Sequence, residues 1–110
     1  MQKDTNILLD HMRDSISVIE GATNGMTFEE FKKNVTVQDC VVRRIEIIGE
    51  AANHIPDSFQ VEHSEIEWRK IVGMRNIIAH EYFGVDLKIV WDTLTTRIPV
   101  LKEELSKIEI

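Results

Sequence analysis

The chain has 110 residues, of which 43% are hydrophobic and 29% charged, the composition of a globular domain rather than of a disordered chain. Its net charge of −6 argues against broad nonspecific nucleic-acid binding, so any RNA site has to be a local basic pocket. The single cysteine, Cys40, excludes an internal disulfide and is typical of a reducing compartment. Because no apolar run is long enough for a membrane span, we expect one cytoplasmic domain over residues 1–110 with no membrane partner.

The amino-terminal third is expected to form two helices. Apolar residues recur at helical spacing from residue 4 or 5 to about residue 22, which predicts a first helix. Thr27-x-x-Glu30 is a capping-box pattern and predicts a short helix through about residue 34.

A long central helix is expected next. Thr36-x-x-Asp39 predicts its start, and Pro56 predicts its end at about Ile55. Its apolar surface is wide enough to have more than one neighbour, and a second copy of the chain is one candidate. Residues 57–63 are expected to form the longest loop.

Two further helices complete the expected fold. Ser64-x-x-Glu67 is a second capping-box pattern, and Asp86 is expected to cap the last helix, which Pro99 must kink or restart. Gly and Pro are scarce and no segment alternates long enough to indicate a sheet. The sequence therefore predicts an all-α fold, an up-and-down bundle of four main helices plus a short extra helix.

An arginine, an amide, an imidazole and a phenol stand within eight positions near the end of the fourth predicted helix: Arg75, Asn76, His80 and Tyr82. Apolar residues separate them, and a buried polar group costs free energy unless it has a partner. On a continuous helix Arg75 and His80 would lie about 140° apart. An unwound last turn, ending at a left-handed Gly84, would bring Arg75, His80 and Tyr82 together.

Arg75-x4-His80-x-Tyr82 resembles the Arg-x4-His-x-Tyr signature of HEPN domains and, within them, of the HepT-like family of toxin subunits. The likeness extends beyond the signature and covers nearly the whole chain. The further segments that carry it are residues 43–52, residues 68–76, residues 79–86 and the pair Val90-Trp91.

The resemblance implies a homodimer in which two protomers face each other and form a metal-independent ribonuclease site for RNA, with tRNA as one candidate. Arg75 would bind the phosphate, His80 would act as base or acid, and Asn76 would orient the phosphate or His80. Proton transfer from the 2′-hydroxyl predicts a cyclic phosphate product. We expect no cofactor, and the scattered histidines have no metal-ligand spacing.

The resemblance also implies a toxin–antitoxin pair, in which a nucleotidyltransferase-fold antitoxin transfers AMP to Tyr82 and silences the nuclease. The rival interpretation is a noncatalytic helical binding partner of such a nucleotidyltransferase-fold protein. In the simplest structural alternative, His80 caps the helix and Arg75 pairs with Glu81 or Asp86.

The charged residues of the central helix have two open interpretations. Most such charges form surface pairs, but one or more of them can line the dimer cleft, where the acidic ones would orient Arg75 or His80. These residues are Arg43, Arg44, Glu46 and Glu50.

Overall fold

The computed structural model describes the backbone of residues 2–83 and 86–108 and the side chains of residues 4–76 and 86–108. Every regular element in these residues is a helix, as predicted. The long ones are α1 (Gln2–Thr23), α3 (Val35–His54) and α5 (Trp68–Phe83), and a fourth, carboxy-terminal run comprises α6 (Leu87–Asp92), η1 (Thr93–Arg97) and α7 (Ile98–Ser106). The short ones are α2 (Phe28–Lys32) and α4 (Asp57–Glu62), one more than expected.

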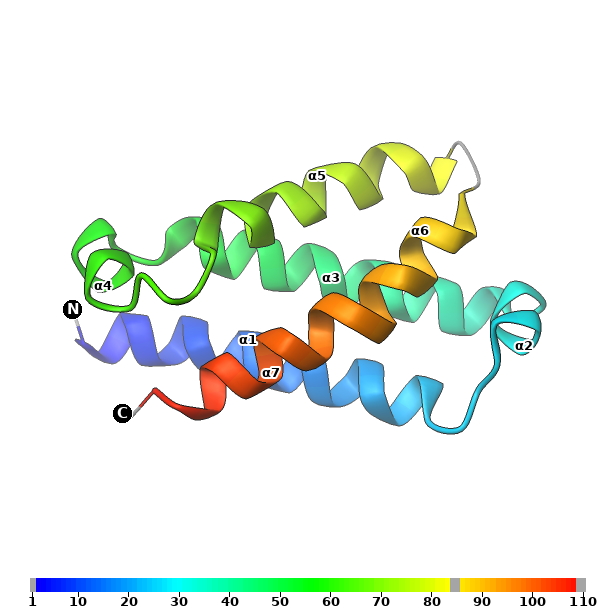
Figure 1. Ribbon diagram of the computed structural model, residues 1–110, viewed down its shortest axis with the longest axis horizontal. Coiled ribbons are helices and arrows are strands. Elements are labelled where there is room, and N and C mark those ends of the chain that lie inside the picture. Colours follow the sequence, from blue (N-terminus) through cyan, green and yellow to red (C-terminus); the bar gives the residue numbers. More distant parts are fainter. Residues whose placement is uncertain (1, 84–85, 109–110) are drawn as a thin grey trace.

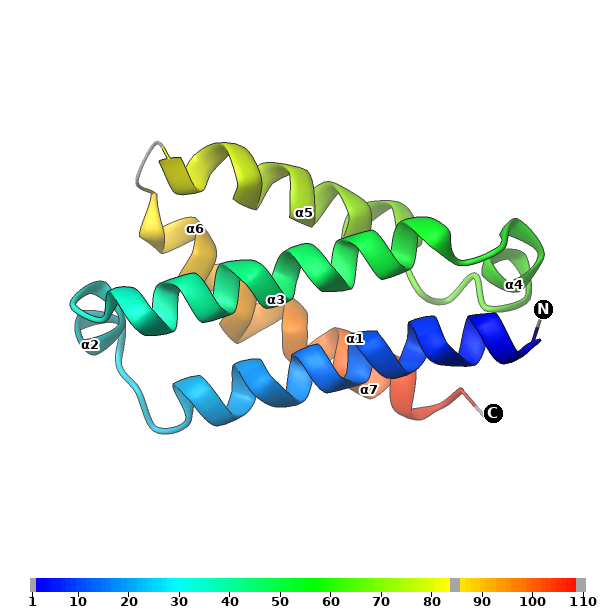
Figure 2. The ribbon, with the colours of Figure 1, turned by 180° about the vertical axis from the view of Figure 1, so that it is seen from behind.

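The bundle is organised around α3, which packs against α1 on one side and α5 on the other (Figure 1). The carboxy-terminal run crosses one face of these three helices, and Figure 2 shows the opposite face. The predicted apolar stripe of α3 is buried in this core, and its members are Val41, Ile45, Ile48 and Ala52. No helix in the described part of the chain is long and apolar enough to cross a membrane.

Side-chain caps fix the starts of α2 and α3. The predicted capping box of α2 is present: Thr27 Oγ1 accepts the Glu30 N–H at 3.2 Å, and Glu30 Oε1 accepts the Thr27 N–H at 2.8 Å. The predicted start of α3 at Thr36 is wrong. Asn34 caps this helix, and its Oδ1 accepts the Val37 N–H at 3.0 Å. The amide side chain of Asn34, two residues before Thr36, therefore takes the place of the expected hydroxyl.

Residues 57–63 do not form the expected loop, because six of them fold as α4 directly after Pro56. The Ser64 capping box is wrong as well. Ser64 lies in a turn, and α5 begins at Trp68, where the Glu67 carbonyl accepts the Ile71 N–H at 3.2 Å. The Trp68 indole also donates to the His63 carbonyl at 3.1 Å. This contact ties the start of α5 to the end of α4.

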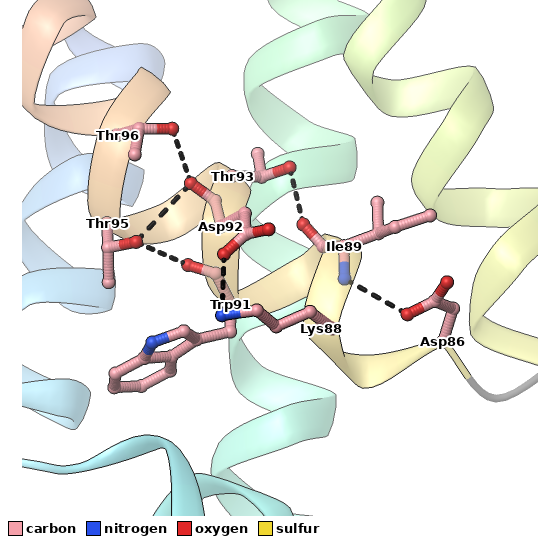
Figure 3. A network of polar contacts seen from close by, with 8 residues as sticks. All are labelled: Asp86, Lys88, Ile89, Trp91, Asp92, Thr93, Thr95 and Thr96. Atoms are coloured by element: carbon pink, nitrogen blue, oxygen red, sulfur yellow. Dashed lines mark hydrogen bonds and ion pairs between the residues drawn. The ribbon is translucent and has the colours of Figure 1, made fainter.

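The carboxy-terminal run begins at the predicted cap, where Asp86 Oδ1 accepts the Ile89 N–H at 3.3 Å (Figure 3). Pro99 lacks an N–H and its ring crowds the preceding turn, so a regular α-helix cannot pass through it. The chain widens into a π-helical turn at Thr93–Arg97 and restarts as α7. The Thr95 and Thr96 hydroxyls donate to carbonyls of the preceding turn (Figure 3).

Candidate active site

A groove of about 520 Å³ lies between α1, α3 and α5, which lie side by side in both ribbon views (Figure 1, Figure 2). It contains Arg75 and Asn76, two of the four polar residues that the sequence pattern singles out. The groove residues from α1 are Leu8 and His11, those from α3 are Arg43, Glu46, Ile47, Glu50, Ala51 and His54, and those from α5 are Arg75 and Asn76.

Arg75 is held by two partners. Its Nε and Nη2 donate to Asn76 Oδ1 at 3.3 and 3.0 Å, and its Nη1 forms an ion pair with Glu50 Oε2. The side chain of Arg75 is 28% exposed. The guanidinium is therefore fixed in direction yet open to solvent, and it has further N–H groups with which to bind a phosphate.

The Glu50 carboxylate lies between two groups that can carry positive charge. One oxygen pairs with Arg75, and the other lies 3.4 Å from Nε2 of His54. Glu50 and His54 are one turn apart on α3, while Arg75 comes from α5. A single carboxylate thus links the two helices at the groove.

Gly49 allows α5 to approach α3 this closely. A Cβ added at Gly49 would overlap Cβ of Arg75 and lie 3.0 and 3.1 Å from its Cγ and Cδ. The stem of Arg75 therefore lies directly against the backbone of α3, where only glycine leaves room. The base of the side chain is set by Gly49 and its charged end by Glu50 and Asn76.

The groove contains two arginines and two glutamates in a protein whose net charge is −6. Arg43 and Arg75 are permanently charged, and His11 and His54 add groups that can be protonated. Glu46 and Glu50 balance the formal charge of the two arginines. A phosphodiester would meet arginine donors here, but the described lining carries no formal excess of positive charge, so it is not the basic pocket that the sequence predicts.

His80 and Tyr82 belong to the last turns of α5, and their side chains lie outside the described residues. The expected unwinding of this turn is wrong, because α5 remains helical through Phe83. A regular helix places position 80 about one turn after Asn76, and position 82 about two turns after Arg75. α5 is described as far as Phe83, and the predicted stop at a left-handed Gly84 lies outside the described residues.

Of the two simplest alternatives for Arg75, pairing with Asp86 is not what the structure has, and Glu81 lies outside the residues whose side chains are described. The carboxylate partner of Arg75 is Glu50, while the Asp86 side chain caps α6. One of the two sequence interpretations of Glu50 is that it orients Arg75. The position of Glu50 in the groove, paired with Arg75, agrees with that interpretation. Gly49 and His54 were not identified from the sequence. The spacing Glu50-x3-His54 was the available signal, but it becomes meaningful only once α5 is placed against α3.

Comparisons with known proteins place this chain in a family. The model of the family described as Ribonuclease HepT-like matches residues 12–108. A Methanocaldococcus jannaschii protein, named as a gamma-glutamylcyclotransferase and provisionally as an RNase, is 44% identical over 98% of this chain and 49% of its own length. The chain thus spans about half of that relative.

Two other relatives are covered almost completely. A Thermococcus cleftensis protein, named provisionally as ribonuclease HepT, is 38% identical over 98% of both chains. A Caldanaerobacter subterraneus protein, named provisionally as an RNase, is 37% identical over 91% of this chain and 89% of its own length. No solved structure matches the chain. On the family match and these identities, the chain belongs to the HepT-like ribonuclease family.

Proposed function

We propose that this chain is a metal-independent endoribonuclease that cleaves RNA, with tRNA as the first candidate substrate, in the groove around Arg75. The observation that carries the proposal is the Arg75 guanidinium, which Asn76 and Glu50 hold at the groove surface before any substrate is present. Membership of the HepT-like ribonuclease family supports it. A fixed, solvent-facing guanidinium suits a phosphate that gains negative charge in the transition state.

The proposed reaction uses the RNA's own 2′-hydroxyl as nucleophile. A base takes the 2′-hydroxyl proton, the 2′-oxygen bonds to phosphorus, and the bond from phosphorus to the 5′-oxygen breaks as an acid protonates that oxygen. The products are a 2′,3′-cyclic phosphate and a 5′-hydroxyl. In this scheme Arg75 binds the phosphate, His80 serves as base or acid, and Asn76 orients the Arg75 guanidinium.

We further propose that the active species is a homodimer, because one His80 cannot readily serve as base and acid in the same turnover. A second protomer facing the groove would supply a second imidazole and a second guanidinium. Sedimentation equilibrium tests this step, and a monomer at the concentrations at which RNA is cleaved would contradict it.

The proposed biological role is that of a toxin controlled by a nucleotidyltransferase-fold antitoxin, which transfers AMP to Tyr82. Tyr82 is the only tyrosine in the chain, so the modified residue is unambiguous. An anionic adduct in the same stretch as Arg75 would compete with RNA phosphate. Incubation with the cognate transferase and ATP should add the mass of one AMP to wild type but not to Tyr82→Phe. An unchanged wild-type mass would reject this role.

The nuclease proposal is tested by incubating the purified chain with total tRNA in the presence of a chelator. We expect cleavage by wild type and a loss of at least about a hundredfold in Arg75→Ala and His80→Ala. The matched control is Arg69→Ala, which removes an exposed arginine from the same helix but outside the groove and should cleave like wild type. Undiminished cleavage by Arg75→Ala would place the site elsewhere, and an inactive wild type would reject the proposal.

A further inference from the structure

Two opposite effects of the Glu50 carboxylate on RNA binding in the groove have to be distinguished. A carboxylate paired with the phosphate-binding arginine can fix that arginine for the substrate, or it can occupy the arginine in place of a phosphate. The two roles have opposite consequences for RNA affinity, and the contacts of Arg75 distinguish them.

The first observation is that Arg75 is constrained along its whole length. Its stem lies against Gly49, where a Cβ would approach Arg75 Cδ to 3.1 Å. One edge of its guanidinium donates to Asn76 Oδ1, and Nη1 pairs with Glu50. An arginine side chain free in solvent samples many rotamers, so these contacts remove an entropic cost that RNA binding would otherwise carry.

The second observation concerns the donors that remain. A guanidinium has more N–H groups than the contacts with Asn76 and Glu50 use. With 28% of the Arg75 side chain exposed, a phosphate oxygen can approach Arg75 without displacing Glu50. The carboxylate is therefore compatible with a bound substrate, which favours a positioning role over competition.

The third observation is that the carboxylate is itself oriented. Glu50 Oε1 lies 3.4 Å from His54 Nε2 on the same helix, while Oε2 faces Arg75. Each oxygen thus has its own partner, and a rotation of the carboxylate that improved one contact would weaken the other. Glu50 therefore contacts one partner on its own helix and one on α5.

We propose that Glu50 is a positioning residue of the ribonuclease site, which acts on RNA cleavage only through the orientation of the Arg75 guanidinium. This inference rests on the proposed function. It assigns no contact between Glu50 and RNA. It requires that Glu50 matter for turnover when Arg75 is present and not matter when Arg75 is absent.

The test is a double-mutant cycle of RNA cleavage with wild type, Glu50→Gln, Arg75→Ala and the double variant. Glu50→Gln keeps the shape of the side chain but removes its charge. We expect kcat to fall about tenfold to a hundredfold with KM changed less than about threefold, as for a misplaced transition-state contact. In the Arg75→Ala background, the same substitution should change the rate less than about twofold.

The matched control is Glu20→Gln. Glu20 forms another ion pair between helices, with Lys102 Nζ at 3.0 Å, on α1 and α7 and outside the groove. Its substitution makes the same change in net charge and breaks the same kind of surface pair, so kcat and KM should stay at wild-type values. Thermal unfolding of all variants confirms that the activities compare folded proteins.

Three results would overturn the inference. One is a lower KM with an undiminished kcat in Glu50→Gln, which would show that the carboxylate competes with RNA. Another is a loss no larger than that of Glu20→Gln. The third is an equal loss in the Arg75→Ala background, which would mean that Glu50 acts by another route. If wild type cleaves no RNA at all, the proposed function fails first, and the inference fails with it.

Discussion

At the scale of single residues, the groove depends on Gly49, which has no side chain. Gly49 leaves the space that the stem of Arg75 fills, so the position of the guanidinium is decided by the backbone of α3 as much as by its hydrogen bonds. This contact could not be predicted from the sequence, because it joins residues of two helices whose relative placement is a property of the folded bundle. By contrast, Arg75 and Asn76 themselves were identified from local spacing.

Gly49→Ala is expected to destabilise the protein and impair cleavage. Overpacking against Arg75 costs about 1–3 kcal/mol, while alanine is about 1 kcal/mol better than glycine in a helix, so we expect a net loss of up to about 2 kcal/mol. Urea unfolding measures it. Gly73→Ala in α5, where an added Cβ meets no atom within 4 Å, should be stabilising instead. Equal stabilisation by both substitutions would contradict the proposed contact.

Glu104 on α7 gives a prediction that depends on pH. Burial raises the pKa of its carboxyl above the usual 4.5, and the Glu67 carboxylate adds to the shift. A raised carboxyl pKa means that the folded state binds the proton more tightly, so stability is lost as pH rises above 4.5 and through the folded-state pKa.

Glu104→Gln should therefore raise the thermal midpoint at about pH 7, by the equivalent of less than about 1 kcal/mol because the carboxyl is largely solvated. The gain should vanish at about pH 4, where both states of the wild type hold the proton. The exposed neighbour Glu103 supplies the control substitution, Glu103→Gln. A gain that persisted unchanged at low pH would rule out titration of Glu104 as the cause.

At the scale of elements, the sequence predicted the long helices better than their ends. Apolar periodicity placed α1, α3 and α5, because burial in the bundle requires that pattern. The short α4 was missed because its few turns are mostly polar and carry no such pattern. The effect of Pro99 was predicted only as a kink or restart, since the π-helical turn at Thr93–Arg97 depends on which nearby groups donate to the carbonyls of this segment, as the Thr96 hydroxyl does to Asp92.

At the start of α3, the sequence prediction and the structure name different capping residues, Thr36 and Asn34. Asn34→Ala removes the observed cap and should destabilise the protein by about 1 kcal/mol. Thr36→Ala, at the exposed position that the sequence pattern favoured, should change stability by less than about 0.5 kcal/mol. Chemical denaturation of both variants is the measurement. The reverse order of effects would mean that Thr36 caps the helix in solution.

At the scale of the whole molecule, the bundle places its predicted phosphate-binding residues on an open groove between α1, α3 and α5. The all-α architecture followed from composition and periodicity, and the family from the extended resemblance around residues 68–86. The groove did not follow from the sequence, because its walls come from three helices and its arginine is oriented by Glu50, 25 residues away. The proposed function therefore depends on whether this groove cleaves RNA.

The chemical nature of the product ends tests that claim most directly. Wild type and Arg75→Ala are incubated with tRNA under chelator, and the termini of the fragments are determined by mass spectrometry. We expect 2′,3′-cyclic phosphate and 5′-hydroxyl ends from wild type, and the same fragments at least about a hundredfold more slowly from Arg75→Ala. Fragments with 5′-phosphate and 3′-hydroxyl ends, or no cleavage until a metal ion is added, would contradict this expectation.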